Sequence, residues 1–210
     1  MEKYSSFAGK SMPMGEKIPN FSMIGVHNNV YVKIHTKHLE GKFCVILFMD
    51  NKASELEIKE WQAFSSKFDE FSEMDVRLIG VCTDSHIAVR AFMHDHHLQG
   101  IKFPIISDLE GELSRSFGVL KIHKEKAGSE RFAAARAVVI LNDKMEMVYL
   151  QLKNEKVASD PQDIISFLRN AKAEKMPTIP LATKIESNAG EDNISLKSNQ
   201  IMFEKDKRFQ

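Results

Sequence analysis

Two almost uniformly apolar segments, each followed by a helical pattern, constrain the fold of this chain more than any other feature. Residues 43–49 (FCVILFM) and 76–81 (VRLIGV) have the composition of strands that are covered on both faces of a sheet. After the first, apolar residues recur at the three- and four-residue spacing of a helix: Ile58, Trp61, Phe64, Phe68 and Phe71. The second leads into a further helical segment at 87–98. An order of strand, helix, strand, helix predicts parallel neighbours at the centre of an α/β sheet.

The rest of the chain supplies the other elements of such a sheet. We expect a half-exposed strand at 30–34, a short strand at 103–106, a helical turn at 113–117, a hairpin of strands at 137–141 and 147–152, and a closing helix at 161–171. A hairpin that follows two parallel units gives a sheet of mixed direction. The sequence therefore predicts an α/β protein with a thioredoxin-like fold, a mixed central sheet and helices on both faces.

Composition divides the chain into three parts. Residues 1–17 are polar, and we expect them to form a loose N-terminal arm. Residues 18–172 hold all the strands and helices predicted above and form one domain. Residues 173–210 are polar and charged, as expected of a flexible C-terminal tail.

Charge and cysteine content exclude several classes of function. The chain has 29 basic and 29 acidic residues, so no net charge favours nucleic acid or an anionic membrane. No apolar stretch approaches the roughly 20 residues that cross a bilayer, and the first residues lack the apolar run of a signal peptide. Two cysteines inside apolar segments do not make a disulfide framework. We expect a cytoplasmic protein with no cofactor, no nucleic-acid partner and no membrane partner.

Five short motifs occur in order along the chain: GEKIPNF at 15–21, LIGVCTDSH at 78–86, FPIISD at 103–108, FGVL at 117–120 and RAVVIL at 136–141. Together they resemble motifs of the peroxiredoxins, the alkyl hydroperoxide reductase and thiol-specific antioxidant family. Their order and spacing are most similar to the typical two-cysteine branch, and the resemblance covers residues 16–172. It implies a thioredoxin-like fold, and it assigns the family's catalytic arginine to Arg136.

The resemblance fails at the residues that carry the family's chemistry. The pattern Pro-x-x-x-Thr/Ser-x-x-Cys falls on residues 50–57, with its Pro at Asp50, its Thr/Ser at Ser54 and its peroxidatic Cys at Glu57. Glu60 and Arg136 are retained. Peroxide reduction of this type requires a thiolate that becomes a sulfenic acid, and a carboxylate has no such state. We therefore expect a protein that is inactive as a thiol peroxidase and has a scaffold, chaperone-like or regulatory role.

Two further departures support that expectation. The second arginine of the branch falls on Ser159, and the tail lacks the resolving cysteine that the branch carries in a Val-Cys-Pro motif. The resemblance implies a homo-oligomer, either a dimer or a ring of dimers, and assembly with active peroxiredoxin paralogues is a further expectation.

Glu57 has two interpretations. In the first, Ser54-Glu55-Leu56-Glu57 is a capping box, with Ser54 and Glu57 satisfying each other's backbone N–H groups at a helix start. In the second, a carboxylate facing Arg136 imitates the sulfinate of an over-oxidised peroxiredoxin. The resemblance connects that oxidation state with large ring assemblies and chaperone-like behaviour.

The two cysteines also leave alternatives open. Cys44 lies at the start of its strand, far from the carboxyl edge where ligands bind, so we interpret it as a packing residue. Cys82 follows Val81 at the carboxyl end of a neighbouring strand, on that edge, and is either a buried thiol or a displaced nucleophile. The second reading makes the protein a thiol-dependent peroxide reductase or a redox sensor that uses Cys82.

Two polar clusters remain. The segment Met93-His94-Asp95-His96-His97 contains residue types that bind metals, but only His94 and His97 share a helix face. We interpret it as a solvent-exposed helix end and expect no metal site. The charged segment at 121–126 is predicted to be an exposed loop.

Overall fold

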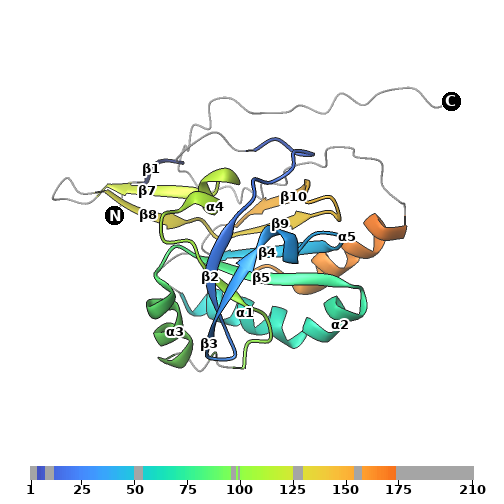
Figure 1. The fold of residues 1–210 in the computed structure, drawn as a ribbon, viewed down its shortest axis with the longest axis horizontal. Helices are drawn as coiled ribbons and strands as arrows, with labels where there is room; N and C mark the ends of the chain where they lie inside the picture. The colour runs from blue at the N-terminus through green and yellow to red at the C-terminus, as the bar shows by residue number, and fades with distance from the viewer. Residues whose placement is uncertain are drawn as a thin grey trace.

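A seven-stranded mixed sheet forms the centre of the molecule, and a three-stranded sheet lies at one end of it. The computed structural model describes residues 4–7, 12–49, 54–95, 98, 100–124, 130–153 and 158–173. Figure 1 shows the large sheet, whose strand order is β10-β9-β4-β5-β6-β2-β3. Its strands are β2 Ser22–His27, β3 Val30–His35, β4 Phe43–Met49, β5 Val76–Cys82, β6 Ile105–Ser107, β9 Ala137–Leu141 and β10 Met147–Leu152.

The two central strands are those that the apolar segments predict. Strand β4 pairs in parallel with β5 and antiparallel with β9, so the sheet is mixed. Side chains alternate between its faces, and residues from both faces are buried in separate hydrophobic clusters. The predicted mixed sheet is confirmed.

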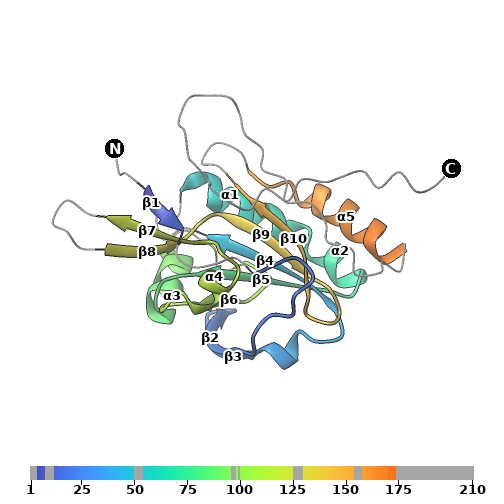
Figure 2. The same ribbon diagram turned by 90° about the horizontal axis from the view of Figure 1, so that it is seen from above.

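Helices cover the two faces unequally. The helices are α1 Glu55–Ser66, α2 Phe68–Glu73, α3 His86–Asp95, α4 Glu112–Ser116 and α5 Pro161–Ala173, with a 3-10 turn, η1, at Thr36–His38. Four helices contribute buried residues to one cluster: Trp61, Phe64, Phe71, Val89, Met93, Ile164, Ile165 and Leu168. Helix α4 and the segments around Ile18, Leu39 and Met145 cover the other face. Figure 2 shows α1, α2 and α5 together against the sheet.

Several elements differ from the sequence expectations. The helix expected to run from Ile58 to Phe71 is two helices, which meet at Lys67. The backbone N–H of Lys67 is shared between the carbonyls of Ala63 and Phe64, as is common where a helix ends. Strand β2 was not expected. It forms a hairpin with β3 through Asn28 and Asn29, whose φ values of 48° and 63° suit a tight hairpin turn.

The three-stranded sheet corrects two expectations. It consists of β1 Tyr4–Phe7, β7 Leu120–Lys124 and β8 Glu130–Ala134, in the order β1-β7-β8. The expected loose arm therefore contains a strand, and the expected charged loop begins with one, because each finds backbone partners only in the folded chain. Figures 1 and 2 show β7 and β8 extending outward from the body of the molecule.

Some expectations concern residues that the structure does not describe. These are Asp50, His96, His97 and all but the first residue of the tail at 173–210. The domain boundaries remain predictions. Within the described ranges, no helix has the length and apolar character needed to span a membrane.

Candidate functional site

The candidate site lies where β4 and β5 end, α1 begins and β9 begins. Met49, the last residue of β4, is in register with Cys82, the last residue of β5. On the other side of β4, Phe48 is in register with Ala137, so Arg136 immediately precedes β9 at the same edge. Ligands bind at the carboxyl ends of strands in open α/β sheets. Four elements thus bring the sequence-predicted residues to one edge.

Ser54 and Glu57 form the predicted capping box. The Glu57 carboxylate accepts hydrogen bonds from the backbone N–H of Ser54 at 2.8 Å and from its hydroxyl at 2.9 Å. In return, the backbone N–H of Glu57 donates to Ser54 Oγ at 3.4 Å. This reciprocal pair satisfies two backbone donors at the start of α1, and a carboxylate there complements the helix dipole. The capping interpretation of Glu57 is confirmed.

Arg136 lies between two carboxylates. Its Nη2 donates a hydrogen bond to Glu60 Oε2, and its Nε is 3.8 Å from Glu57 Oε1. All three residues are nearly inaccessible, with 6% of Arg136, 3% of Glu57 and 7% of Glu60 exposed. Glu57 and Glu60 share a face of α1 because they are three residues apart. The cluster contains two carboxylates and one guanidinium. Removing one partner from such a buried ionic cluster lowers the stability of the protein, because it leaves charge in the interior.

Cys82 borders the same cluster but is poorly suited to act as a nucleophile. Its thiol donates to Asp84 Oδ2 at 3.6 Å and is 4% exposed. Burial raises the pKa of Cys82 far above its ordinary value, and the negative charges of Asp84 and Glu57 raise this pKa further. The thiol therefore stays protonated at neutral pH, whereas thiol chemistry requires the thiolate.

Cys44 is a packing residue. It is fully buried near the start of β4, and burial raises the pKa of its thiol to about 12, against the opposing effect of the nearby Arg77 charge. Like Cys82, it is a free cysteine.

The structure brings together four of the five residues predicted for the degenerate site. Ser54, Glu57, Glu60 and Arg136 meet at the start of α1, whereas Asp50 lies outside the described residues. The sequence did not lead us to expect Asp84 among the site residues. Its place two residues after the end of a strand could have indicated it, because that edge of the sheet is where ligands bind. Ser159, aligned with the branch's second arginine, is buried.

The histidine cluster gives no metal site among the described residues. His94 and Asp95 are exposed, and their side chains are 3.4 Å apart. Across the described part of the chain, no three His, Cys, Asp or Glu side chains are arranged to hold a metal ion.

Comparison with known sequences identifies relatives over most of the chain. The sequence profile of the AhpC/TSA family matches residues 14–150. The chain is 24% identical to "Putative peroxiredoxin ycf42" of Pyropia yezoensis over 160 residues, which are 74% of this chain and 76% of that protein. It is 26% identical to "Putative peroxiredoxin YkuU" of Bacillus subtilis, covering 74% of this chain and 87% of that protein. With "Peroxiredoxin 2" of Sulfurisphaera tokodaii the identity is 29%, over 62% of this chain and 59% of that protein.

Solved structures show the same fold. The AhpC of Enterococcus faecalis superposes with a TM-score of 0.69 at 20% identity, covering 78% of this chain and 95% of that one. The AhpC of Mycobacterium tuberculosis superposes with a TM-score of 0.67 at 21% identity, covering 80% of this chain and 97% of that one. The fold is therefore the thioredoxin-like fold of the peroxiredoxins, as the sequence predicts.

Proposed function

This chain belongs to the AhpC/TSA family, and on that premise we propose that it is a non-catalytic, peroxiredoxin-like member with a scaffold, chaperone-like or regulatory role. In this proposal Glu57 occupies the position of the peroxidatic cysteine. The single observation that supports it most is the set of polar interactions that hold the Glu57 carboxylate in place. That group is buried, accepts two hydrogen bonds from Ser54 and lies beside Arg136.

The chemistry of the carboxylate supports inactivity at this position. A peroxidatic thiolate attacks the O–O bond of the peroxide, becomes a sulfenic acid and releases the other oxygen as water or an alcohol, whereas a carboxylate has no corresponding oxidised state. A helix start and an arginine stabilise an anion at position 57 whether the anion is a thiolate or a carboxylate. Glu57 therefore retains the electrostatics of the position without its reactivity.

A Cys82-dependent peroxide reductase or redox sensor is the alternative. Its support is the position of Cys82 at the carboxyl edge of the sheet, next to the Glu57 cluster. Its weakness is the raised pKa of the thiol, because burial and two neighbouring carboxylates all oppose thiolate formation.

A peroxide assay separates the two functions. Purified protein is mixed with hydrogen peroxide and dithiothreitol, peroxide consumption is followed, and mass spectrometry measures oxidation at Cys82. We expect no turnover above the protein-free rate. Turnover that the Cys82→Ser variant abolishes would overturn the proposal in favour of the alternative.

A repair variant tests the assignment of position 57. In Glu57→Cys the new thiol lies at the start of α1 beside Arg136, an environment that lowers a thiol pKa. We expect peroxide to form a sulfenic acid at position 57, trapped with dimedone and located by mass spectrometry. The matched control is Glu55→Cys, because Glu55 is an exposed acid of the same helical turn. Equal labelling at positions 55 and 57 would contradict the assignment.

We also propose that the charge of Glu57 favours a homo-oligomer, either a dimer or a ring of dimers. A buried carboxylate beside Arg136 resembles a sulfinate in charge and in hydrogen-bond acceptance. Sedimentation velocity and a holdase assay on wild type, Glu57→Gln and the exposed control Glu55→Gln test this. Unchanged assembly size and holdase activity in Glu57→Gln would refute the sulfinate analogy. Assembly with active paralogues and a cytoplasmic location remain predictions.

A further inference from the structure

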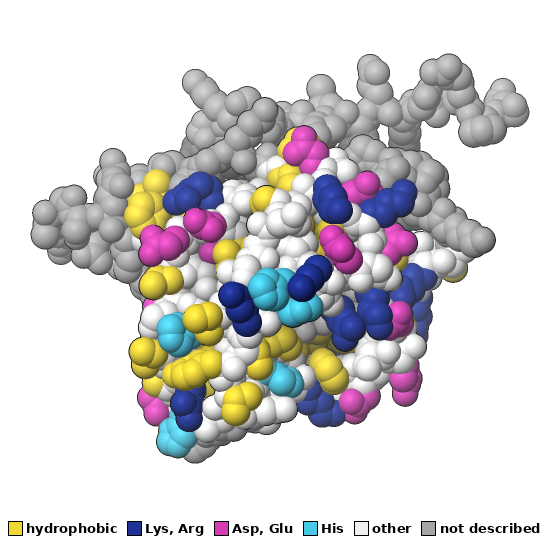
Figure 3. All heavy atoms as spheres, in the orientation of Figure 1, with side chains coloured by type: hydrophobic (Ala, Val, Ile, Leu, Met, Phe, Trp, Pro, Cys, Tyr) yellow, Lys and Arg dark blue, Asp and Glu magenta, His cyan; other side chains and the backbone are white. Residues whose placement is uncertain are grey.

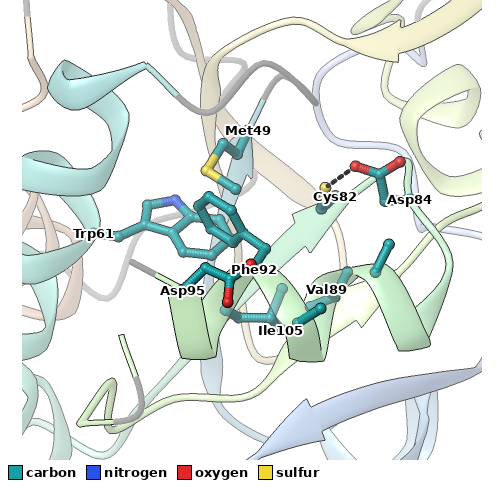
Figure 4. Close-up of a pocket in the computed structure, with 10 residues that line it drawn as sticks. Met49, Trp61, Cys82, Asp84, Val89, Phe92, Asp95 and Ile105 are labelled. Atoms are coloured by element: carbon teal, nitrogen blue, oxygen red, sulfur yellow. Dashed lines mark hydrogen bonds between the residues drawn. The ribbon is translucent and has the colours of Figure 1, made fainter. Parts of the chain in front are cut away.

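A cavity lies beside the Glu57 cluster, between α1, α3 and the sheet. Its volume is about 330 Å³, within the range of small-molecule sites. Ten of the described residues line it: Met49, Trp61, Cys82, Asp84, Ala88, Val89, Ala91, Phe92, Asp95 and Ile105. Figure 4 shows Trp61 on one side of this pocket, with Cys82 and Asp84 on the other.

The wall of the pocket is apolar and held in place. Trp61 is 2% exposed and packs edge-on against Phe103, with ring centroids 6.0 Å apart. Gly80 leaves room for the indole, because a Cβ there would lie 3.1 Å from Trp61 Cη2. Ala88 and Ala91 are small, exposed residues of α3 at the opening of the pocket. The cavity therefore offers a preformed surface for a compact apolar group.

Among the residues that the structure describes, the charged groups that line the pocket are both negative. Asp84 and Asp95 are carboxylates, and no Lys or Arg is among the ten lining residues. The Asp84 carboxylate is half-buried and accepts from the protonated thiol of Cys82, while its backbone carbonyl accepts from Ser107 Oγ at 2.6 Å. Asp95 is 73% exposed and lies at the rim. A cation is attracted both by these carboxylates and by the faces of aromatic rings.

From this combination we propose that the pocket binds a small organic ammonium ion, with its apolar body against Trp61 and Phe92 and its charged end paired with Asp84. Asp95 adds a weaker attraction at the rim, since an exposed carboxylate is screened by solvent. Ligand binding in this pocket does not require a particular residue at position 57. The experiments below therefore test it independently of the proposed function.

Trp61 provides a direct probe, because it is the only tryptophan in the chain. Benzylamine, benzyl alcohol and benzoate share a ring and differ in charge, and each is titrated against the full-length protein. We expect saturable changes in Trp61 emission with benzylamine, about tenfold weaker binding of the alcohol, equivalent to about 1.4 kcal/mol, and no binding of benzoate. Saturation-transfer NMR on the same samples detects binding that leaves the emission unchanged.

Three variants locate the site. Asp84→Asn keeps the shape of the side chain and removes its charge, so benzylamine binding weakens about tenfold while benzyl alcohol binding is unchanged. Ala91→Leu fills the opening and abolishes binding of both. Ala173→Leu, at an exposed position at the end of α5, is the matched control and leaves binding intact.

The proposal is overturned by any of three results. One is the absence of benzylamine binding by both fluorescence and NMR. The second is equal affinity for benzylamine and benzyl alcohol, which would remove the role of Asp84. The third is undiminished binding to Ala91→Leu, which would place the ligand elsewhere.

Discussion

Replacing Arg136 by methionine is the sharpest test of the buried charge cluster. The substitution keeps an unbranched apolar side chain but removes the guanidinium that lies between Glu57 and Glu60. Both carboxylates then remain inside the protein and lose the positive charge of this guanidinium. Because all three residues are at most 7% exposed, water cannot replace the lost interactions without local opening.

The expected cost is large. Removing one partner of a buried ion pair costs about 3–5 kcal/mol, since it leaves uncompensated charge in the interior. The free energy of unfolding of a domain is only about 5–15 kcal/mol, so Arg136→Met is expected to remove a substantial fraction of it. Neutralising both acids in the same background (Arg136→Met with Glu57→Gln and Glu60→Gln) is expected to restore about half of the loss, because no charge stays buried.

Urea denaturation followed by Trp61 fluorescence and circular dichroism measures these free energies, at two protein concentrations so that any effect of assembly is seen. The matched control is Arg169→Met. Arg169 is 57% exposed and 3.7 Å from Glu70, and surface pairs contribute about 0–1 kcal/mol. A loss below about 1 kcal/mol in Arg136→Met, or a triple variant no more stable than the single one, would refute the reasoning.

Three other predictions use the same denaturation assay. Ser54→Ala removes the cap of α1 and is expected to cost about 1 kcal/mol, whereas Ser66→Ala, which loses only an exposed bond to a carbonyl, stays within about 0.5 kcal/mol; equal losses would argue against the cap. Gly25→Ala places a Cβ 2.8 Å from the Ile105 carbonyl oxygen and is expected to cost about 1–3 kcal/mol, while Gly100→Ala meets no atom within 4 Å and should be nearly neutral. Burial raises the pKa of Cys44 from 9.0 to about 12, so the folded state keeps a proton that the unfolded chain releases. Stability should therefore fall as pH rises from 9.0 toward 12, and Cys44→Ala should show a shallower fall; parallel curves would contradict this.

Local pattern identified the elements that form the sheet centre and the helix start. The apolar runs at 43–49 and 76–81 are so uniform that only a strand covered on both faces accommodates them, and β4 and β5 have nearly these bounds. The capping box was also readable, because Ser54 and Glu57 bond to each other across one helical turn.

Long-range pairing was harder to predict. Strands β1 and β7 are short, carry mixed side chains and are stabilised by backbone bonds between residues more than 100 positions apart. Nothing in either segment alone favours a strand over a polar loop. The break between α1 and α2 at Lys67 likewise lies within a continuous apolar spacing.

The sequence by itself determined the fold class and the absence of sulfur at position 57, because apolar periodicity and residue identity are local properties. Only the tertiary structure decided what surrounds that position. Glu57, Glu60 and Arg136 come from segments about 80 residues apart, and their burial together depends on how β9 pairs with β4. The same packing determines that the Cys82 thiol is buried beside carboxylates, which is why its pKa is raised.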